Sequence, residues 1–421
     1  MPAKQELDVF IHDMLAMSAF CYHFHSIRTI VRSKDNTTVK TGFLGFGKPR
    51  EIKFFRPELI ITRNSGIERD PNQQLLHDIT PAAIQEFIEN NRSLFQDDDM
   101  DGSLEFDPSD TKKDEPFLVE GVLKEQMEDN LKIIDYDDRF STDKGGLVYM
   151  IVTNLTQKTI TVCFRGTIGT TDMHTDRDFR LNTEAFFGSE DDFSVPKSES
   201  HNPATHNGFT TYLTSNRETD SIERPYAQRI LACLNAEFGN NKDVKGKGFK
   251  LFVTGHSLGG GLANLFAFRA AQLKARGDKA VEHLPDMIKA LTFAAPCVGN
   301  EGYEAEFQAL EKKGFLRHIR VANEEDVVPT NCISLPFSLA IKGDTSLYRQ
   351  NGVNLQFHPD KTCDIVYGNT KSMLSQFSPT RSLNTHYLTE YRVRVGKPEN
   401  EKVYDQTIED IYKEATNNFA A

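Results

Sequence analysis

The chain has 421 residues, of which 38% are hydrophobic and 26% are charged, fractions that are ordinary for a globular protein. Its formal net charge of -12 would repel a polyanion, so we expect no nucleic-acid partner. No apolar run approaches the length that a transmembrane helix needs. The six cysteines are widely scattered and form no Cys-x-x-Cys pair, which argues against a metal ribbon or a compact disulfide framework. We expect neither a metal site nor a cofactor.

The amino-terminal residues combine acidic side chains with a helical pattern. Acids stand where a signal peptide would need a basic head and an apolar stretch, so we expect a cytoplasmic protein in a reducing compartment. Between Leu7 and Phe24, apolar residues recur close to a helical period, which predicts an amphipathic helix that packs on a core. We assign residues 1–31 to this helix.

Residues 32–117 differ in texture from the rest of the chain and are predicted to be an insertion of unknown role. Glycines and prolines punctuate the stretch, an acidic run closes it, and residues 81–95 predict a helix with proline at its start. Between Lys40 and Arg56, five basic residues interleave with apolar ones. This composition suits peripheral contact with a lipid surface, and the alternative is a β-hairpin whose phenylalanines pack inward.

Two ligand-binding patterns in the insertion are incomplete. Gly42–Lys48 satisfies the first seven positions of a phosphate-binding loop, but Pro49 replaces the serine or threonine that would hold magnesium, so we expect no nucleotide. In the stretch from Asp97 to Asp107, residues 97–104 fit the first half of a calcium loop, yet Pro108 stands at the twelfth position instead of a bidentate glutamate. Calcium binding and an exposed acidic loop both stay open there.

From Gly146 onward, short β-rich runs alternate with helical stretches. This alternation predicts an α/β fold with a mainly parallel central sheet and helices on both faces. The predicted strands are residues 147–152, 159–164, 250–254, 289–293, 317–322 and 391–395, and the predicted helices are residues 222–238 and 258–275.

One segment of this region carries a catalytic pattern. The stretch KLFVTGHSLGGGLANLFAF at 250–268 runs from an apolar strand through Gly-His-Ser-Leu-Gly into a helix, which is typical of a nucleophile elbow. A serine on so sharp a turn sits in strained backbone, and the two glycines let strand and helix approach closely. The hydroxyl of Ser257 would stand clear of the sheet, above a helix N-terminus that favours developing negative charge.

A serine nucleophile needs a base and an orienting carboxylate, which in this type of fold follow in the order serine, acid, histidine. Asp326 is the predicted acid, because it follows a predicted strand and its apolar neighbours and Pro329 favour a fixed, partly buried position. His386 is the predicted base, because it lies in a turn directly before the run YRVRV. The alternative, His358, is followed by a proline in a polar loop.

The tetrahedral intermediate needs two hydrogen-bond donors for its oxyanion. The backbone N–H of Leu258, the residue after the predicted nucleophile, is one of them. Thr167 is the candidate for the second, because it ends a glycine-hinged turn after a predicted strand and would present its N–H and hydroxyl.

Taken together, these stretches resemble the class 3 lipases of the α/β-hydrolase superfamily, which include fungal triacylglycerol lipases, feruloyl esterases and plant-type phospholipases A1. The resemblance covers the first helix and residues 118–396 and rests on Phe164–Thr167, His206–Phe209, Val253–Gly260, Thr292–Gly299, Asn323–Pro329, and His386 with Tyr387. The family's nucleophile, acid, base and oxyanion donors fall on the residues already chosen: Ser257, Asp326, His386, Thr167 and Leu258. It implies an α/β-hydrolase lipase domain over 118–400, followed by a C-terminal helix or tail over 401–421.

The resemblance also implies roles for other positions. His206 and His256 match structural positions of the family, Arg165 would pin the oxyanion loop, and residues 168–181 would form the lid over the serine. That stretch has few apolar residues and carries Phe179 where a tryptophan is common, so we expect only weak activation at a lipid interface.

The function that the resemblance implies is hydrolysis of acyl esters of glycerolipids through an acyl-enzyme intermediate. Triacylglycerol or partial glycerides are the expected substrates. The alternative is a phospholipase A1 or galactolipase that acts on membrane lipids, and a more distant one is a catalytically silent lipid-binding protein.

Overall fold

The computed structural model describes residues 6–33, 38–40, 49–51, 131–138, 147–166, 181–182, 203–215, 225–330, 348–360, 362–368, 384–395 and 401–420. Of the predicted insertion it describes two short strands, β1 (Thr38–Lys40) and β2 (Pro49–Glu51), which pair antiparallel, while the phenylalanines of the hairpin alternative lie outside the described residues. The helix predicted at 81–95, the segment Gly42–Lys48 and the stretch from Asp97 to Asp107 lie outside the described residues, and the domain boundaries stay predictions.

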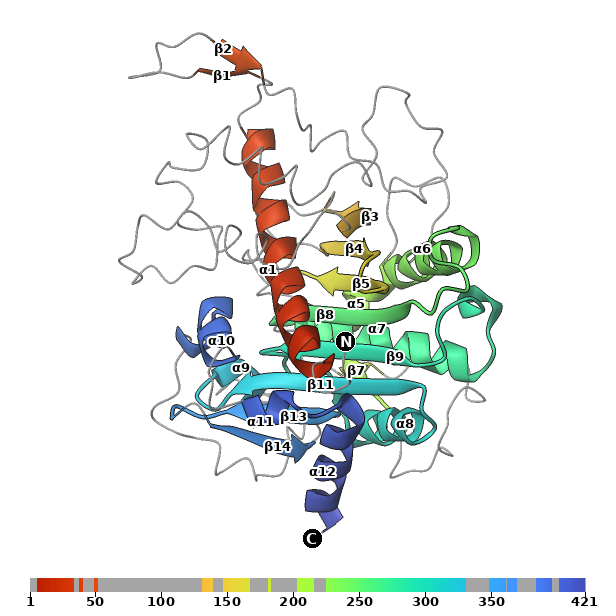
Figure 1. Ribbon diagram of the computed structural model, residues 1–421, viewed down its shortest axis with the longest axis vertical. Coiled ribbons are helices and arrows are strands. Elements are labelled where there is room, and N and C mark those ends of the chain that lie inside the picture. Colours follow the sequence, from red (N-terminus) through yellow and green to blue (C-terminus); the bar gives the residue numbers. More distant parts are fainter. Residues whose placement is uncertain are drawn as a thin grey trace.

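An eight-stranded sheet forms the centre of the molecule (Figure 1). Its strands, in spatial order, are β14 (Cys363–Tyr367), β13 (Val353–Phe357), β11 (Leu316–Asn323), β9 (Ile288–Phe293), β8 (Lys250–His256), β5 (Thr159–Phe164), β4 (Tyr149–Asn154) and β3 (Leu131–Asp137). The five central strands from β13 to β5 run parallel, and antiparallel strands close both edges. All parallel strands therefore end at the same edge, where ligand sites of open α/β sheets form.

Helices cover both faces of this sheet (Figure 1). One face carries α1 (Glu6–Ser33), α10 (Leu388–Val395), α11 (Glu401–Tyr404) and α12 (Ile408–Ala420), and the other carries α5 (Asn207–Thr214), α6 (Tyr226–Asn240), α7 (Leu258–Ala275) and α8 (Glu301–Lys312). A hydrophobic core lies between the sheet and each of these two sets of helices. In β8, Phe252 packs in the core on the α1 side, and Leu251 and Val253 pack in the core on the α7 side, because successive side chains of a strand alternate between faces. The α/β fold class expected from the sequence, a mainly parallel central sheet with helices on both faces, is confirmed.

Shorter elements complete the described chain. A small antiparallel sheet contains β12 (Tyr348–Arg349), β10 (Gly299–Asn300), β7 (Thr205–His206) and β6 (Leu181–Asn182). The remaining turns are η8 (Lys279–Val281), α9 (Val327–Thr330) and η12 (Asn384–His386). No helix in the described part of the chain combines the length and the apolar character that crossing a membrane would require.

Most of the predicted elements match the structure closely. The strand expected at 159–164 and the helix expected at 258–275 have the same bounds in the structure, and four other strands agree within two residues. The strand expected at 391–395 is wrong, because these residues lie in α10. Tyr391 and Val395, one helical turn apart, are both buried, whereas Val393 is 49% exposed. Packing of this helical face on α1 thus overrides the alternation in the sequence.

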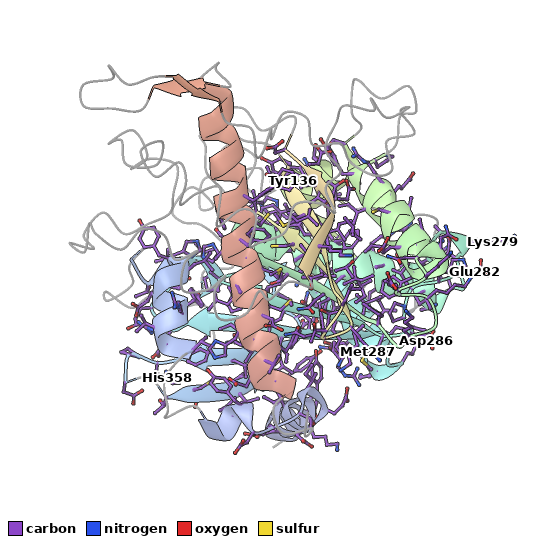
Figure 2. The ribbon with its side chains drawn as sticks, turned by 45° about the horizontal axis from the view of Figure 1, so that its top comes forward. Tyr136, Lys279, Glu282, Asp286, Met287 and His358 are labelled. Carbon is purple, nitrogen blue, oxygen red and sulfur yellow. The ribbon has the colours of Figure 1, made fainter. Side chains whose placement is uncertain are left out.

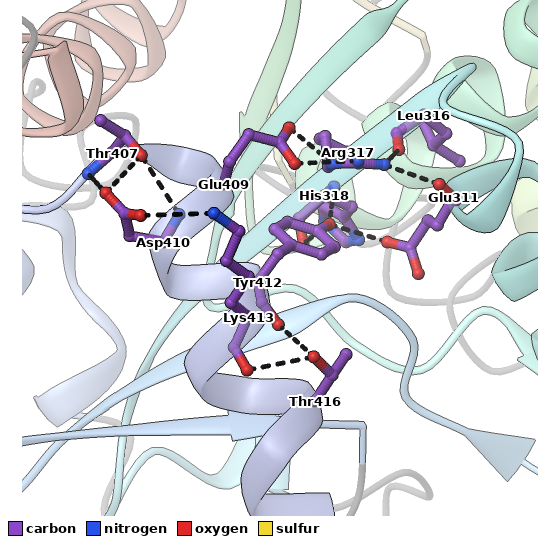
Figure 3. Close-up of polar contacts among 10 residues, drawn as sticks. All are labelled: Glu311, Leu316, Arg317, His318, Thr407, Glu409, Asp410, Tyr412, Lys413 and Thr416. Carbon is purple, nitrogen blue, oxygen red and sulfur yellow. Dashed lines mark hydrogen bonds and ion pairs between the residues drawn. The ribbon is translucent and has the colours of Figure 1, made fainter.

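A buried polar cluster fixes the last helix to the amino end of β11 (Figure 3). This C-terminal cluster consists of Glu311 of α8, His318 of β11, Tyr367 of β14 and Tyr412 of α12. Tyr412 Oη donates to Glu311 Oε1 at 2.7 Å and accepts the main-chain N–H of His318, and the hydroxyl of Tyr367 donates to Glu311 Oε2. Buried hydrogen bonds therefore connect α12 to α8 and to the central sheet.

Candidate active site

The turn between β8 and α7 contains Ser257, the predicted nucleophile. Its backbone has φ 57° and ψ -128°, a conformation that is rare for a residue with a side chain and that is often kept at functional sites. A Cβ on Gly255 would lie 2.3 Å from the carbonyl oxygen of Gly259, and a Cβ on Gly259 would lie 2.2 Å from that of Phe164. Only glycines allow strand and helix to approach this closely, and their approach forces the serine outward.

The structure brings the three predicted triad residues together. Ser257 Oγ lies 2.9 Å from His386 Nε2, and His386 Nδ1 lies 3.0 Å and 2.9 Å from the two carboxylate oxygens of Asp326. A carboxylate only accepts hydrogen bonds, so Nδ1 carries the proton and Nε2 is the nitrogen that accepts from the serine hydroxyl. The imidazole is thus held in the tautomer that can remove a proton from Ser257.

Asp326 is itself fully buried and held by further donors. The main-chain N–H of Val328 donates to Oδ1 at 2.9 Å, and the hydroxyl of Tyr391 donates to Oδ2 at 2.7 Å. Burial, and then the nearby charge of Asp326, raise the pKa of Tyr391 well above its usual value, so this hydroxyl stays a donor. The N–H of Asn323 in turn donates to the Tyr391 oxygen at 3.1 Å. The carboxylate of Asp326 therefore has a fixed orientation toward the His386 ring.

The described residues contain one of the two predicted oxyanion donors. Leu258 is the first residue of α7, and the first N–H groups of a helix have no partner within the helix. Thr167 lies outside the described residues, as do residues 168–180 of the predicted lid. The preceding residues are described: Arg165 Nε donates to the Gly166 carbonyl at 3.1 Å, and a Cβ on Gly166 would lie 3.2 Å from Ser257 Cβ. The end of this loop therefore lies beside the serine.

Two other histidines that the sequence singles out lie in supporting positions. His206 caps α5, where its Nδ1 accepts the N–H of Phe209 at 3.4 Å. His358 follows β13, the strand next to the edge strand β14 and far from Tyr136 of β3 (Figure 2), and its two nitrogens pair with Glu324 and Asp364 at 2.8 Å and 2.9 Å. The alternative base is thus engaged by two carboxylates at that edge.

His256 lies directly beneath the site. Its Nε2 contacts the main-chain oxygen of His386 at 2.7 Å, and its Nδ1 contacts the hydroxyl of Tyr22 at 3.2 Å. Burial, and then the neighbouring His386 ring, hold the pKa of His256 well below its usual value. The ring is therefore neutral, and it supports the main chain that carries the predicted base.

Sequence reasoning missed Tyr391 and Tyr22, which contact the site from helices. Tyr391 was placed in a strand, and only its helical spacing to the buried Val395 would have indicated otherwise. No motif marks Tyr22, which lies 234 residues before His256. Among the described residues, no group of three His, Cys, Asp or Glu side chains is arranged to hold a metal ion.

Comparisons with known proteins show what this chain is similar to. Residues 161–334 match the family model "Lipase (class 3)", and this segment includes Ser257, Leu258 and Asp326. Two curated relatives are "Phospholipase A1-II 6" of Oryza sativa subsp. japonica, 27% identical over 48% of this chain, and "Phospholipase A1-Igamma1, chloroplastic" of Arabidopsis thaliana, 37% identical over 20% of it. The matches span 49% and 16% of those two proteins, so the chain spans about half or less of their length.

Solved structures of lipases are also similar. Lipase II from Rhizopus niveus is 20% identical, with 64% of this chain and 83% of that chain covered and a TM-score of 0.41. A triacylglycerol lipase from Penicillium expansum is 19% identical, with 57% and 75% covered and a TM-score of 0.39.

Proposed function

We propose that this chain, which belongs to the class 3 lipase family through residues 161–334, is a serine carboxylic-ester hydrolase that acts on glycerolipids. The observation that carries the proposal is the continuous hydrogen-bond path from Ser257 through His386 to Asp326. The strained backbone of Ser257 supports it further, because strain of this kind is kept where a hydroxyl must be presented to a substrate.

Each residue has a defined role in the proposed reaction. Ser257 Oγ attacks the ester carbonyl carbon while its proton passes to His386 Nε2, and the oxyanion accepts hydrogen bonds from Leu258 and Thr167. His386 then returns the proton to the leaving alcohol as the C–O bond breaks. Water, activated by the same nitrogen, hydrolyses the acyl-enzyme and restores the serine. Asp326 keeps Nδ1 protonated and stabilises the imidazolium that forms in both steps.

A labelling experiment tests the proposed function whatever the natural substrate is. A fluorophosphonate probe is expected to form one covalent adduct, on Ser257, and boiling should abolish it because the reaction needs the assembled triad. The Ser215→Ala variant, which changes a serine at the end of α5, is the matched control and should label like the wild type. Absence of an adduct on Ser257 in folded protein would contradict the proposal and favour a silent lipid-binding protein.

The substrate class is the second part of the proposal. We propose triacylglycerol or partial glycerides, with phospholipid or galactolipid as the second candidate, because the two curated relatives are named as phospholipases A1. Initial rates on triolein, phosphatidylcholine and monogalactosyl diacylglycerol separate these candidates. Peripheral contact of the protein with a lipid surface accompanies either candidate, and sedimentation with vesicles of the preferred lipid measures it.

We propose, finally, the cytoplasmic location expected from the sequence. Among the described cysteines, Cys21, Cys163, Cys233 and Cys363 form no disulfide bond, which fits a reducing compartment, whereas Cys297 is disulfide-bonded, which fits an oxidising one. Thiol labelling of denatured protein taken directly from its cells distinguishes these cases. Labelling of Cys297 in the absence of a reductant supports the cytoplasmic location, and labelling only after reduction contradicts it.

A further inference from the structure

The hydroxyl of Tyr22 lies where three segments of the proposed active site meet. It contacts His256 Nδ1 at 3.2 Å, and His256 directly precedes Ser257. A Cβ built on Gly166 would lie only 1.9 Å from the same hydroxyl oxygen, so Tyr22 also packs against the backbone of the loop that leads to Thr167. Through His256 it is connected to the main chain of the base, His386.

The chemistry of the groups sets the direction of these hydrogen bonds. The main-chain oxygen of His386 can only accept, so His256 Nε2 must carry the hydrogen that is donated to it over 2.7 Å. Because burial and the neighbouring imidazole lower the pKa of His256, its ring is neutral and Nδ1 is an acceptor. The hydroxyl of Tyr22 is therefore the donor to Nδ1, and a defined path runs from Tyr22 through His256 to the carbonyl of His386.

Helix α1 fixes the position of the Tyr22 hydroxyl. One turn earlier, Ser18 Oγ donates to the Met14 carbonyl at 2.9 Å and lies 3.3 Å from Thr254 Oγ1 of β8. Ser18 and Tyr22 are four residues apart, so they share the helix face that lies along β8. Tyr22 is only 5% exposed. The hydroxyl thus has a rigid support that does not depend on the loops of the site.

We propose that Tyr22 is a positioning residue of the ester-hydrolase site, which acts through His256 to hold the main chain of His386 and so the distance between base and nucleophile. The inference rests on the proposed function. Without the Tyr22 hydroxyl, His256 Nδ1 would be a buried acceptor that has lost this donor, and the ring would lose its preferred orientation. Small displacements of a base from its productive geometry reduce the rate of the chemical step without weakening substrate binding.

The Tyr22→Phe variant tests this inference. We expect kcat to fall about tenfold, which corresponds to about 1.4 kcal/mol, while KM changes by less than about twofold. The rate constant for fluorophosphonate labelling of Ser257 should fall by the same factor as kcat, because it reports the same proton transfer. Tyr404→Phe, which removes a buried tyrosine bond to the Val395 carbonyl in the same core, is the matched control and should retain wild-type kcat.

A double-mutant cycle tests whether Tyr22 acts through His256. His256→Gln interrupts the path, so adding Tyr22→Phe to it should reduce kcat by less than about twofold more. Full additivity, with losses multiplied to about a hundredfold, would overturn the inference. Wild-type rates in Tyr22→Phe would overturn it as well.

The measurements separate this inference from the proposed function. If wild-type protein neither hydrolyses esters nor labels at Ser257, the proposed function fails, and the inference fails with it. If wild-type protein is active and Tyr22→Phe matches it in kcat, labelling rate and Tm, only the role of Tyr22 is refuted. A parallel loss of Tm and kcat in Tyr22→Phe, equal to that in Tyr404→Phe, would show a purely structural role and also refute it.

Discussion

Strand β11 has a buried carboxylate near each of its ends, and the two carboxylates differ in their hydrogen-bond partners. Beyond its carboxyl end, Asp326 accepts from the hydroxyl of Tyr391 and from the His386 ring. At its amino end, Glu311 accepts from the hydroxyls of Tyr367 and Tyr412. Both carboxylates use tyrosine donors, but only the first also orients an imidazole whose second nitrogen faces a hydroxyl.

The buried histidines of the two regions, His318 and His386, also differ in their partners. In the C-terminal cluster, His318 Nε2 lies 2.9 Å from Thr292 Oγ1, and its Nδ1 lies 3.2 Å from Asn351 Oδ1. Burial, and then the nearby Arg320, lower the pKa of His318 to about 3, so this ring stays neutral at working pH. His386 instead faces Ser257 on a strained turn beside a helix N-terminus. Similar residue types thus hold the fold at one end and are placed for chemistry at the other.

The largest expected effect is a loss of activity without a loss of stability, caused by a substitution at the proposed nucleophile. Ser257→Ala should reduce ester hydrolysis at least about ten-thousandfold, because no group remains to form the acyl-enzyme. Its Tm should stay within a few degrees of the wild type, since no bond within either core is removed. Steady-state rates and thermal unfolding of both proteins measure this, and Ser215→Ala is the control. Ester hydrolysis by Ser257→Ala within tenfold of the wild type would contradict the assignment of the nucleophile.

The C-terminal cluster should contribute to the pH dependence of stability. Burial raises the pKa of Glu311 from 4.5 to about 7. Between these values the folded state binds more protons than the unfolded state, so this group makes the free energy of unfolding fall as pH rises from about 4.5 to about 7.

Glu311→Gln removes that titration and should flatten the curve. Between pH 4.5 and pH 7.5, the free energy of unfolding of the variant should rise by up to about 3 kcal/mol relative to that of the wild type, because the amide has no proton to release. Urea unfolding at a series of pH values measures the difference, in which the contributions of unchanged groups cancel. Parallel curves for the two proteins would show that Glu311 is not the titrating group.

A smaller effect is expected for Tyr391→Phe, which removes one of the donors to Asp326. The carboxylate keeps the Val328 N–H and the His386 ring, so kcat should fall about tenfold rather than to the level of Ser257→Ala. KM should stay unchanged because the tyrosine is fully buried and the hydroxyl that the variant loses is bonded to Asp326 and to the N–H of Asn323. A wild-type kcat in the folded variant would show that the remaining donors suffice to orient Asp326.

These regions also differ in how far the sequence predicts them. The turn around Ser257 depends on five consecutive residues whose backbone demands are specific, so a single motif identifies it. Asp326 and His386 follow from chain order in that fold. The tyrosines have no such signal, because Tyr391 and Tyr412 reach their carboxylates through tertiary packing of helices over separations of 65 and 101 residues.

Periodicity fails for a related reason. The run at 391–395 satisfies both a two-residue and a helical repeat, and only the position of α1 decides between them. Sequence alone cannot supply that position, since it depends on contacts between α1 and strands more than a hundred residues away. The same long-range packing places Tyr22 at the site.

The smallest expected effect concerns the outer rim of the C-terminal cluster (Figure 3). Arg317 Nε and Nη2 donate to the two carboxylate oxygens of Glu409 at 2.9 Å and 3.0 Å, but Glu409 is half exposed. Glu409→Gln should therefore lower the free energy of unfolding by only about 0.5 kcal/mol, and by less at high salt, and it should leave kcat unchanged. Arg317 stays in place, because it also donates to the Glu311 carbonyl and lies over the Tyr412 ring. A loss above about 1.5 kcal/mol by urea unfolding would mean that the ion pair, and not the buried bonds of Glu311, anchors α12.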